Sequence, residues 1–131
     1  MKVMIVDDNE QNLYYLEVLL KSEKYEVVCA RDGLEALEQL KRDSFSLIIS
    51  DILMPRMDGF QLCRECKIDP HLTYIPFIFY TATYTDRKDE EFGLSLGADR
   101  FVIKPTEPQK FLTLLREVIK EHEKGALRKE P

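Results

Sequence analysis

Short apolar runs alternate with amphipathic segments along most of this sequence. The apolar runs are almost unbroken, which is typical of strands that are buried on both faces of a sheet. The segments between them have a helical period, so the pattern predicts strand and helix in alternation, repeated five times. We predict strands at Val3–Val6, Val27–Ala30, Leu47–Ser50, Pro76–Tyr80 and Phe101–Ile103.

A helix is predicted after each of these strands. The fourth, at about residues 86–96, is short and polar, whereas the fifth has a continuous apolar face over residues 111–119. Thr106 has the spacing of a capping residue for the fifth helix, and Gly125 is a candidate for its end. The apolar positions of the first three helices are Leu13, Leu16 and Leu20; Leu34, Leu37 and Leu40; and Phe60, Leu62, Cys63 and Cys66.

This alternation predicts the α/β class: a doubly wound, five-stranded parallel sheet with helices on both faces and right-handed crossovers. A chain of 131 residues is long enough for one such domain. We expect residues 1–123 to form the domain. Residues 124–131 are charged and aperiodic, so we expect a tail or the start of a linker there.

The composition indicates an ordinary globular protein and excludes several partners. The net charge of −5 does not favour direct binding to nucleic acid or to anionic membranes. There is no apolar stretch long enough to cross a bilayer, and the N-terminus lacks the pattern of a signal peptide. Three cysteines are too few for a disulfide framework. We therefore expect a cytoplasmic protein.

Side chains that suggest a common chemistry follow four of the five predicted strands; Arg31, after the second, adds none. Asp7 and Asp8 follow the first, Asp51 the third, Thr81 the fourth and Lys104 the fifth. The carboxyl ends of parallel strands meet at one edge of the sheet, so we expect these side chains to converge. Two carboxylates about 4 Å apart repel by roughly 4 kcal/mol at an effective dielectric near 20, which favours uptake of a cation or a raised pKa.

The chemistry of this set is that of phosphoryl transfer. Carboxylate oxygens with room for water suit Mg²⁺. A metal ion and a lysine would neutralise phosphoryl oxygens while a carboxylate attacks. Any one of these aspartates alone would be an ordinary helix cap or turn former, so the prediction depends on their occurring together.

The same residues make the sequence resemble the receiver domains of two-component response regulators. That family has a flavodoxin-like (βα)5 fold with strand order 2-1-3-4-5. The likeness runs from residue 2 to about residue 122. It implies a signalling switch in a phosphorelay, which catalyses only its own Mg²⁺-dependent phosphorylation and dephosphorylation. The matching stretches are Val3–Asn9, Leu47–Gly59, Tyr80–Ala82 and Gly97–Pro105.

The resemblance assigns the acceptor and the metal ligands. Asp51 would accept the phosphoryl group from a phosphohistidine of a sensor histidine kinase or of a phosphotransfer protein. Asp8, Asp51 and the backbone carbonyl of Leu53 would bind Mg²⁺, with Asp7 acting through a metal-bound water. Leu53 is apolar and cannot orient a hydrolytic water, so we expect a long-lived phosphoryl group.

The resemblance also implies how the switch works. Lys104, Thr81 and the N–H of Ala82 would bind the phosphoryl oxygens, and the peptide bond between Lys104 and Pro105 would be cis. Thr81 would move toward the phosphoryl group and the ring of Phe101, where the family often has tyrosine, would turn inward. An ordinary role for Phe101 in the core remains an alternative.

The inward movement would remodel the surface of the fourth helix, the fifth strand and the fifth helix. A second copy of the chain, a downstream effector or an output domain outside this sequence would bind there. The sequence leaves open whether the domain works alone or as part of a larger protein.

Three other functions compete with this prediction. Cys63 and Cys66 form a C-x-x-C pair, which suggests a redox protein, although the pair falls inside a predicted helix rather than at its start. A phosphatase that uses an aspartyl nucleophile would carry a second aspartate where Leu53 stands. A nucleotide-binding domain would need a glycine-rich loop after the first strand, and none is present.

Overall fold

The computed structural model describes residues 1–129, in which five strands alternate with five helices. All of the predicted strands and helices are present, with small differences at their ends. The strands are β1 (Lys2–Val6), β2 (Glu26–Ala30), β3 (Leu47–Ser50), β4 (Phe77–Thr81) and β5 (Arg100–Ile103). The helices are α1 (Glu10–Ser22), α2 (Gly33–Arg42), α3 (Gly59–Ile68), α4 (Arg87–Ser95) and α5 (Pro108–Lys129).

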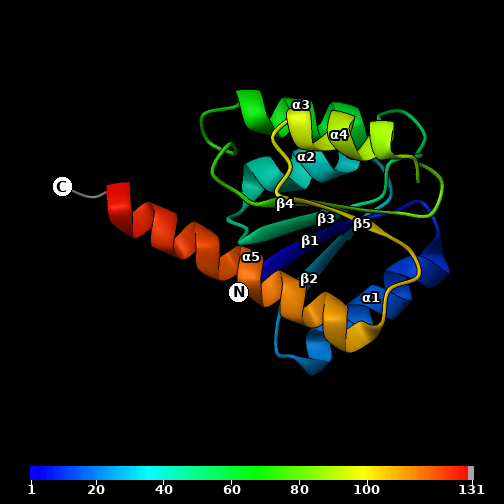
Figure 1. Cartoon of the computed structure of the whole chain (residues 1–131), viewed down its shortest axis with the longest axis horizontal. Coiled ribbons are helices and arrows are strands. Elements are labelled where there is room, and N and C mark those ends of the chain that lie inside the picture. The colour runs from blue at the N-terminus through cyan, green and yellow to red at the C-terminus, as the bar shows by residue number, and fades with distance from the viewer. Residues whose placement is uncertain (130–131) are drawn as a thin grey trace.

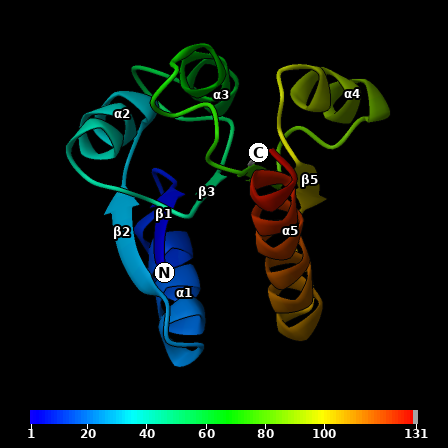
Figure 2. The same ribbon diagram turned by 90° about the vertical axis from the view of Figure 1, so that its left-hand side faces the viewer.

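The strands form one parallel sheet in the order β2-β1-β3-β4-β5, which confirms the predicted flavodoxin-like fold. Figures 1 and 2 show α1 and α5 on one face of the sheet and α2, α3 and α4 on the other. The chain reverses direction across the sheet between β1 and β3. In sheets of this type, that switch point is where ligands bind, beyond the carboxyl ends of the strands.

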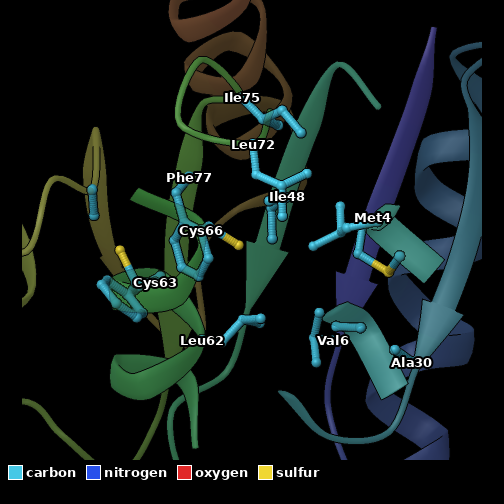
Figure 3. Close-up of a cluster of buried hydrophobic side chains, with 14 of the residues drawn as sticks. Met4, Val6, Ala30, Ile48, Leu62, Cys63, Cys66, Leu72, Ile75 and Phe77 are labelled. Atoms are coloured by element: carbon cyan, nitrogen blue, oxygen red, sulfur yellow. The ribbon is translucent and has the colours of Figure 1, made fainter. Parts of the chain in front are cut away.

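Each face of the sheet has its own hydrophobic core. The side chains of β1 point alternately to the two faces of the sheet. Val3 and Ile5 belong to the core under α1 and α5, and Met4 and Val6 belong to the core under α2, α3 and α4. Figure 3 shows part of the second core, with Met4 and Val6 facing residues of α3. Burial on both faces explains why the strands read as unbroken apolar runs.

The buried face of α2 differs from the predicted one. Leu34 is exposed, whereas Gly33, Ala36 and Leu40 are buried and Leu37 is partly buried. The helix begins at Gly33, which packs directly against the connection between β3 and α3. This contact turns the Gly33–Ala36–Leu40 side of the helix toward the core and leaves Leu34 outside it.

The long helix α5 does not have the predicted ends. It continues through Gly125 to Lys129, so Gly125 does not end it. The Thr106 hydroxyl donates to the carbonyl of Ile103 at 2.9 Å instead of capping the helix, which begins at Pro108. Although α5 has 22 residues, neither it nor any other described helix is apolar enough to span a membrane.

The division of the chain into a domain of residues 1–123 and a tail of residues 124–131 stays a prediction. Helix α5 passes through residue 124 without a break. Residues 130 and 131 lie outside the part of the chain that the structure describes.

Gly59 should be needed for the close packing of the connection between β3 and α3. Its N–H donates to the carbonyl of Ile52 at 2.8 Å, and a Cβ at this position would overlap with the backbone oxygen of Asp51. We expect Gly59→Ala to lower the free energy of unfolding in urea by about 1–3 kcal/mol.

Gly125→Ala is the matched control. Gly125 lies inside α5 with open space where a Cβ would be placed. Alanine there should raise stability by roughly 0.5–1 kcal/mol, because glycine is a poor helix former. An unchanged stability of Gly59→Ala would contradict the close approach to Asp51.

Candidate functional site

Backbone hydrogen bonds continue the sheet beyond the strand ends and align the residues that follow them. The N–H of Asp51 donates to the carbonyl of Val6 at 2.8 Å, and the N–H of Lys104 donates to the carbonyl of Thr81 at 2.8 Å. Asp7 directly follows Val6, so the first bond joins the ends of β1 and β3, the second joins those of β4 and β5, and the pairing of β3 with β4 connects the two. The rigid sheet therefore positions the side chains of Asp7, Asp51 and Lys104 at one edge.

The Lys104 ammonium group lies between two carboxylates. Its Nζ is 3.0 Å from Asp7 Oδ2 and 3.3 Å from Asp51 Oδ2, and it lies 5.1 Å from the centre of the Tyr80 ring. The exposed fractions of the three charged side chains are only 13% for Lys104, 4% for Asp7 and 14% for Asp51. Water screens these charges poorly. Removing Lys104 would therefore be costly, because it would leave the two buried carboxylates without a cation.

Each carboxylate has a second hydrogen bond from the backbone. Asp7 Oδ1 accepts from the N–H of Asn9 at 2.9 Å, and Asp51 Oδ1 accepts from the N–H of Ile52 at 2.7 Å. Burial raises the pKa of Asp51 above its usual value, although the Ile52 N–H and Lys104 act in the opposite direction. Asp51 is thus a partly desolvated carboxyl group whose remaining oxygen faces a cation, which suits a nucleophile.

The three strand-end carboxylates do not form a metal site by themselves. Asp8 is exposed and has no ion pair with Lys104, and among the described residues no three His, Cys, Asp or Glu side chains are placed to hold one ion. Mg²⁺ does not require such a set, because it keeps several waters and is held by one or two carboxylates. Carboxylates at the edge, with the exposed Leu53 (56%) beside them, fit that manner of binding.

Thr81 is fully buried, and its hydroxyl faces the connection between β4 and α4. Thr81 Oγ1 accepts from the N–H of Thr83 at 3.2 Å and from the N–H of Tyr84 at 3.4 Å, and it lies 3.3 Å from Thr83 Oγ1. Ala82 is exposed at the same edge. The Thr81 hydroxyl therefore already has hydrogen-bond partners in Thr83 and Tyr84. It would lose them if it turned toward a group bound to Asp51.

The ring of Phe101 lies inside the protein. It is 9% exposed, and its centre is 5.7 Å from that of Phe79. Gly93 is the only buried residue of α4, and a Cβ there would lie 3.0 Å from both rings. The inward position of Phe101 thus exists in the unmodified chain, where the close approach of α4 at Gly93 holds it.

The structure also shows one expected feature of the site and two that the sequence did not suggest. The peptide bond between Lys104 and Pro105 is cis, the isomer that the resemblance implied. The buried hydroxyl of Ser50 donates to the Asp51 carbonyl at 2.7 Å. An ion pair joins Asp32 to Arg56 beside the site. The position of Asp32 just before the second predicted helix could have suggested that it caps that helix. Nothing in the sequence pointed to Arg56 as its partner.

The C-x-x-C pair has none of the properties of a redox site. Cys63 and Cys66 are buried on the inner face of α3, and Figure 3 shows their sulfur atoms among apolar side chains of the core. Burial raises the pKa of each thiol to about 12. Reactive thiols need a lowered pKa, so a redox function is not supported.

The strand order and the charged group beyond the strand ends define a flavodoxin-like α/β domain with its site at the switch point. Residues 3–116 match the response regulator receiver domain family, and the chain belongs to this family. It is therefore a receiver domain of two-component signalling, which acts as a switch.

Relatives and solved structures agree with this assignment. The response regulator PleD of Caulobacter vibrioides is 43% identical over 104 residues, which cover 79% of this chain and 23% of PleD. A CheY-like receiver domain protein from Methanospirillum hungatei is 30% identical, with a TM-score of 0.87, covering 95% of this chain and 97% of that one.

A second similar structure contains a metal ion. The receiver domain of the sensor histidine kinase PA1611 from Pseudomonas aeruginosa, with magnesium coordinated in its active site cleft, is 27% identical. Its TM-score is 0.82, and the match covers 91% of this chain and 97% of that one. The chain spans about half the length, or less, of the curated relatives that it matches.

The buried thiols should be unreactive in the native protein. Near pH 8 we expect the disulfide reagent DTNB to react with the partly exposed Cys29, whereas Cys63 and Cys66 should react only as fast as the protein unfolds. All three should react rapidly in urea. In a Cys29→Ser variant, rapid reaction of the native protein would contradict this expectation.

Proposed function

We propose that Asp51 is the phosphoacceptor of this domain and that Lys104, Asp7 and Thr81 form the rest of its site. The carrying observation is the Lys104 ammonium group, which lies 3.3 Å from Asp51 and 3.0 Å from Asp7. It places a fixed positive charge beside the candidate nucleophile, where negative charge would gather during phosphoryl transfer. The only reactions catalysed would be the phosphorylation and dephosphorylation of Asp51 itself.

The reaction would join an Asp51 oxygen to phosphorus as the bond from phosphorus to the donor's histidine nitrogen breaks. Lys104 would stay close to Asp51 and pair with a phosphoryl oxygen. The N–H of Ala82, exposed at the same edge, would donate to another. Bound Mg²⁺ would neutralise part of the charge on the transferring group. The donor would be a sensor histidine kinase or a phosphotransfer protein.

The Mg²⁺ ligands would be the carboxylates of Asp8 and Asp51 and the backbone carbonyl of Leu53, with Asp7 contributing through water. The exposure of Asp8 and Leu53 supports this set, because an ion that keeps several waters binds at an open edge. The magnesium in the PA1611 receiver domain is consistent with it.

Phosphorylation would change the hydrogen bonds of Thr81. Its hydroxyl would leave Thr83 and Tyr84 and donate to a phosphoryl oxygen, which is a stronger, charged acceptor. The connection between β4 and α4 would then move, and with it the surface of α4, β5 and α5. Phe101 is already buried, so its part in the switch would be to fix α4 through Gly93 in one of the two states.

That surface would bind a second copy of the chain, an effector protein or an output domain of a larger protein. A cytoplasmic location, where phosphohistidine donors of two-component systems act, stays a prediction. Residues 1–123 would form the receiver domain proper, and the C-terminal turns of α5 extend beyond the rest of the domain (Figure 1).

Incubation with acetyl phosphate and Mg²⁺ tests the acceptor. We expect intact-mass measurement to find one phosphoryl adduct on the wild-type chain, none on Asp51→Asn, and none when EDTA removes the metal. Asp58→Asn is the matched control, because asparagine keeps the helix cap that Asp58 provides for α3. An adduct that survives in Asp51→Asn would contradict the assignment.

Leu53 should prolong the life of the phosphoryl group. It lies exposed two residues after Asp51, where a polar side chain could orient a hydrolytic water. After removal of acetyl phosphate, we expect the adduct of Leu53→Asn to decay faster than that of the wild type by roughly tenfold. Ile68→Asn, an exposed apolar position at the far end of α3, should decay as the wild type does.

A further inference from the structure

The connection between β3 and α3 is held by contacts with the N-terminus of α2. This connection, residues 51–58, contains both Asp51 and Leu53. In the sheet, β1 separates β2 from β3. The N-terminus of α2, which follows β2, meets the connection after β3 because α2 and α3 pack side by side. Two contacts join them, one between side chains and one between backbones.

The side-chain contact is an ion pair between Asp32 and Arg56. Arg56 Nε donates to Asp32 Oδ2 at 2.8 Å, while Asp32 Oδ1 caps α2 by accepting from the N–H of Glu35 at 2.9 Å. The Asp32 side chain is 7% exposed and that of Arg56 is 59% exposed. Burial acts to raise the pKa of Asp32, but the Glu35 N–H and Arg56 outweigh it and hold that pKa below its usual value.

Arg56 has an uncommon backbone conformation that suits a tight turn. Its φ is +64°, in the left-handed region that residues other than glycine rarely adopt. The following N–H, that of Met57, donates to the carbonyl of Pro55 at 2.7 Å. A non-glycine residue remains in this conformation only when its surroundings fix it, and the bond to Asp32 is such a constraint.

The backbone contact lies one residue further along each segment. The N–H of Gly33 donates to the carbonyl of Met57 at 3.0 Å. A Cβ on Gly33 would lie 2.6 Å from Met57 Cγ and 2.9 Å from the Met57 carbonyl oxygen, so the two segments are in direct contact. The connection is therefore fixed on one side by Gly59 against Asp51, and on the other by Asp32 and Gly33.

We propose that the Asp32–Arg56 pair is a clamp that positions the connection carrying the Leu53 carbonyl, and thereby sets the affinity of the site for a divalent cation. The proposal rests on the metal ligands given under the proposed function. Neither Asp32 nor Arg56 would touch the ion; both are positioning residues that act through the backbone of residues 53–57. Partners of this kind orient metal ligands and contribute measurably to affinity.

Electrostatics alone predicts a different pattern, which makes the clamp testable. Without a clamp, removing the negative charge of Asp32 would weaken the binding of a nearby cation, and removing the positive charge of Arg56 would strengthen it. With a clamp, both changes weaken binding, because each frees the same connection. The sign of the effect of Arg56→Ala therefore distinguishes the two explanations.

The experiment titrates the full chain with Mn²⁺, an oxygen-binding divalent cation whose free form is measured directly by electron paramagnetic resonance. We expect Asp32→Asn and Arg56→Ala each to raise the dissociation constant by roughly threefold to tenfold, and the double variant to raise it no further than the larger single effect. Asparagine still caps α2, so Asp32→Asn separates the clamp from the cap.

Two further variants act as controls. Arg56→Gly accepts the positive φ without strain, and it should weaken Mn²⁺ binding as Arg56→Ala does if the lost contact is the cause. Arg116→Ala removes an arginine of similar exposure, 49% against 59% for Arg56, which pairs with Glu23 on the opposite face of the sheet, and it should leave the dissociation constant unchanged. Urea unfolding of each variant shows whether it is folded under the conditions of the titration.

The outcomes separate the clamp from the proposed function. Unchanged or tighter Mn²⁺ binding by Arg56→Ala, with normal binding by the wild type, overturns the clamp and leaves the metal site intact. A wild-type chain that binds no Mn²⁺, or binds it equally well as Asp51→Asn, overturns the metal site and the clamp together. Weaker binding by both single variants without additivity supports the clamp.

Discussion

The structure of this domain depends on one lysine side chain that crosses the edge of the sheet. Lys104 follows β5, yet its ammonium group reaches past the end of β4 to Asp51, which follows β3, and to Asp7, which follows β1. Neighbouring strands lie about 4.8 Å apart and three such intervals separate β5 from β1, so the lysine bridges the strand ends only together with the aspartate side chains that extend toward it. The ammonium group also lies over the ring of Tyr80, 5.1 Å from its centre. Without this cation, two largely buried carboxyl groups would lose the partner that they share.

Two other aspartates near this edge, Asp32 and Asp58, cap helices, as their hydrogen bonds show. Asp32 and Asp58 each accept from a backbone N–H in the first turn of a helix, as Asn9 does for α1. These caps satisfy N–H groups that the helices leave free, and they fix where each helix begins. The candidate site thus lies among helix starts that are themselves held in place. This arrangement helps to hold Asp7 and Asp51 in fixed positions.

A continuous set of aromatic contacts lies between the buried Thr81 and helix α4. Tyr84, whose N–H donates to Thr81, packs edge-on against Phe60 with ring centres 5.5 Å apart, and Phe60 packs against Phe92 of α4 at 4.9 Å. A movement of Thr81 would therefore disturb a packed cluster rather than a loose loop. Packed groups of this kind shift between discrete arrangements, which is what a two-state switch requires.

The sequence by itself determined the strands, the order of secondary structure and the residues at each strand end. These follow from local patterns: unbroken apolar runs, helical periods and a polar residue where each strand stops. The family resemblance added the strand order and the cis bond before Pro105.

Only the tertiary structure decided which of two adjacent aspartates is buried. Asp7 is buried and pairs with Lys104, whereas Asp8, in the bend that follows, is exposed. It also decided that Leu34 lies outside the core and that Asp32 pairs with Arg56. Such contacts join residues far apart in the chain, and they are set by how helices and connections pack together, which no local pattern records.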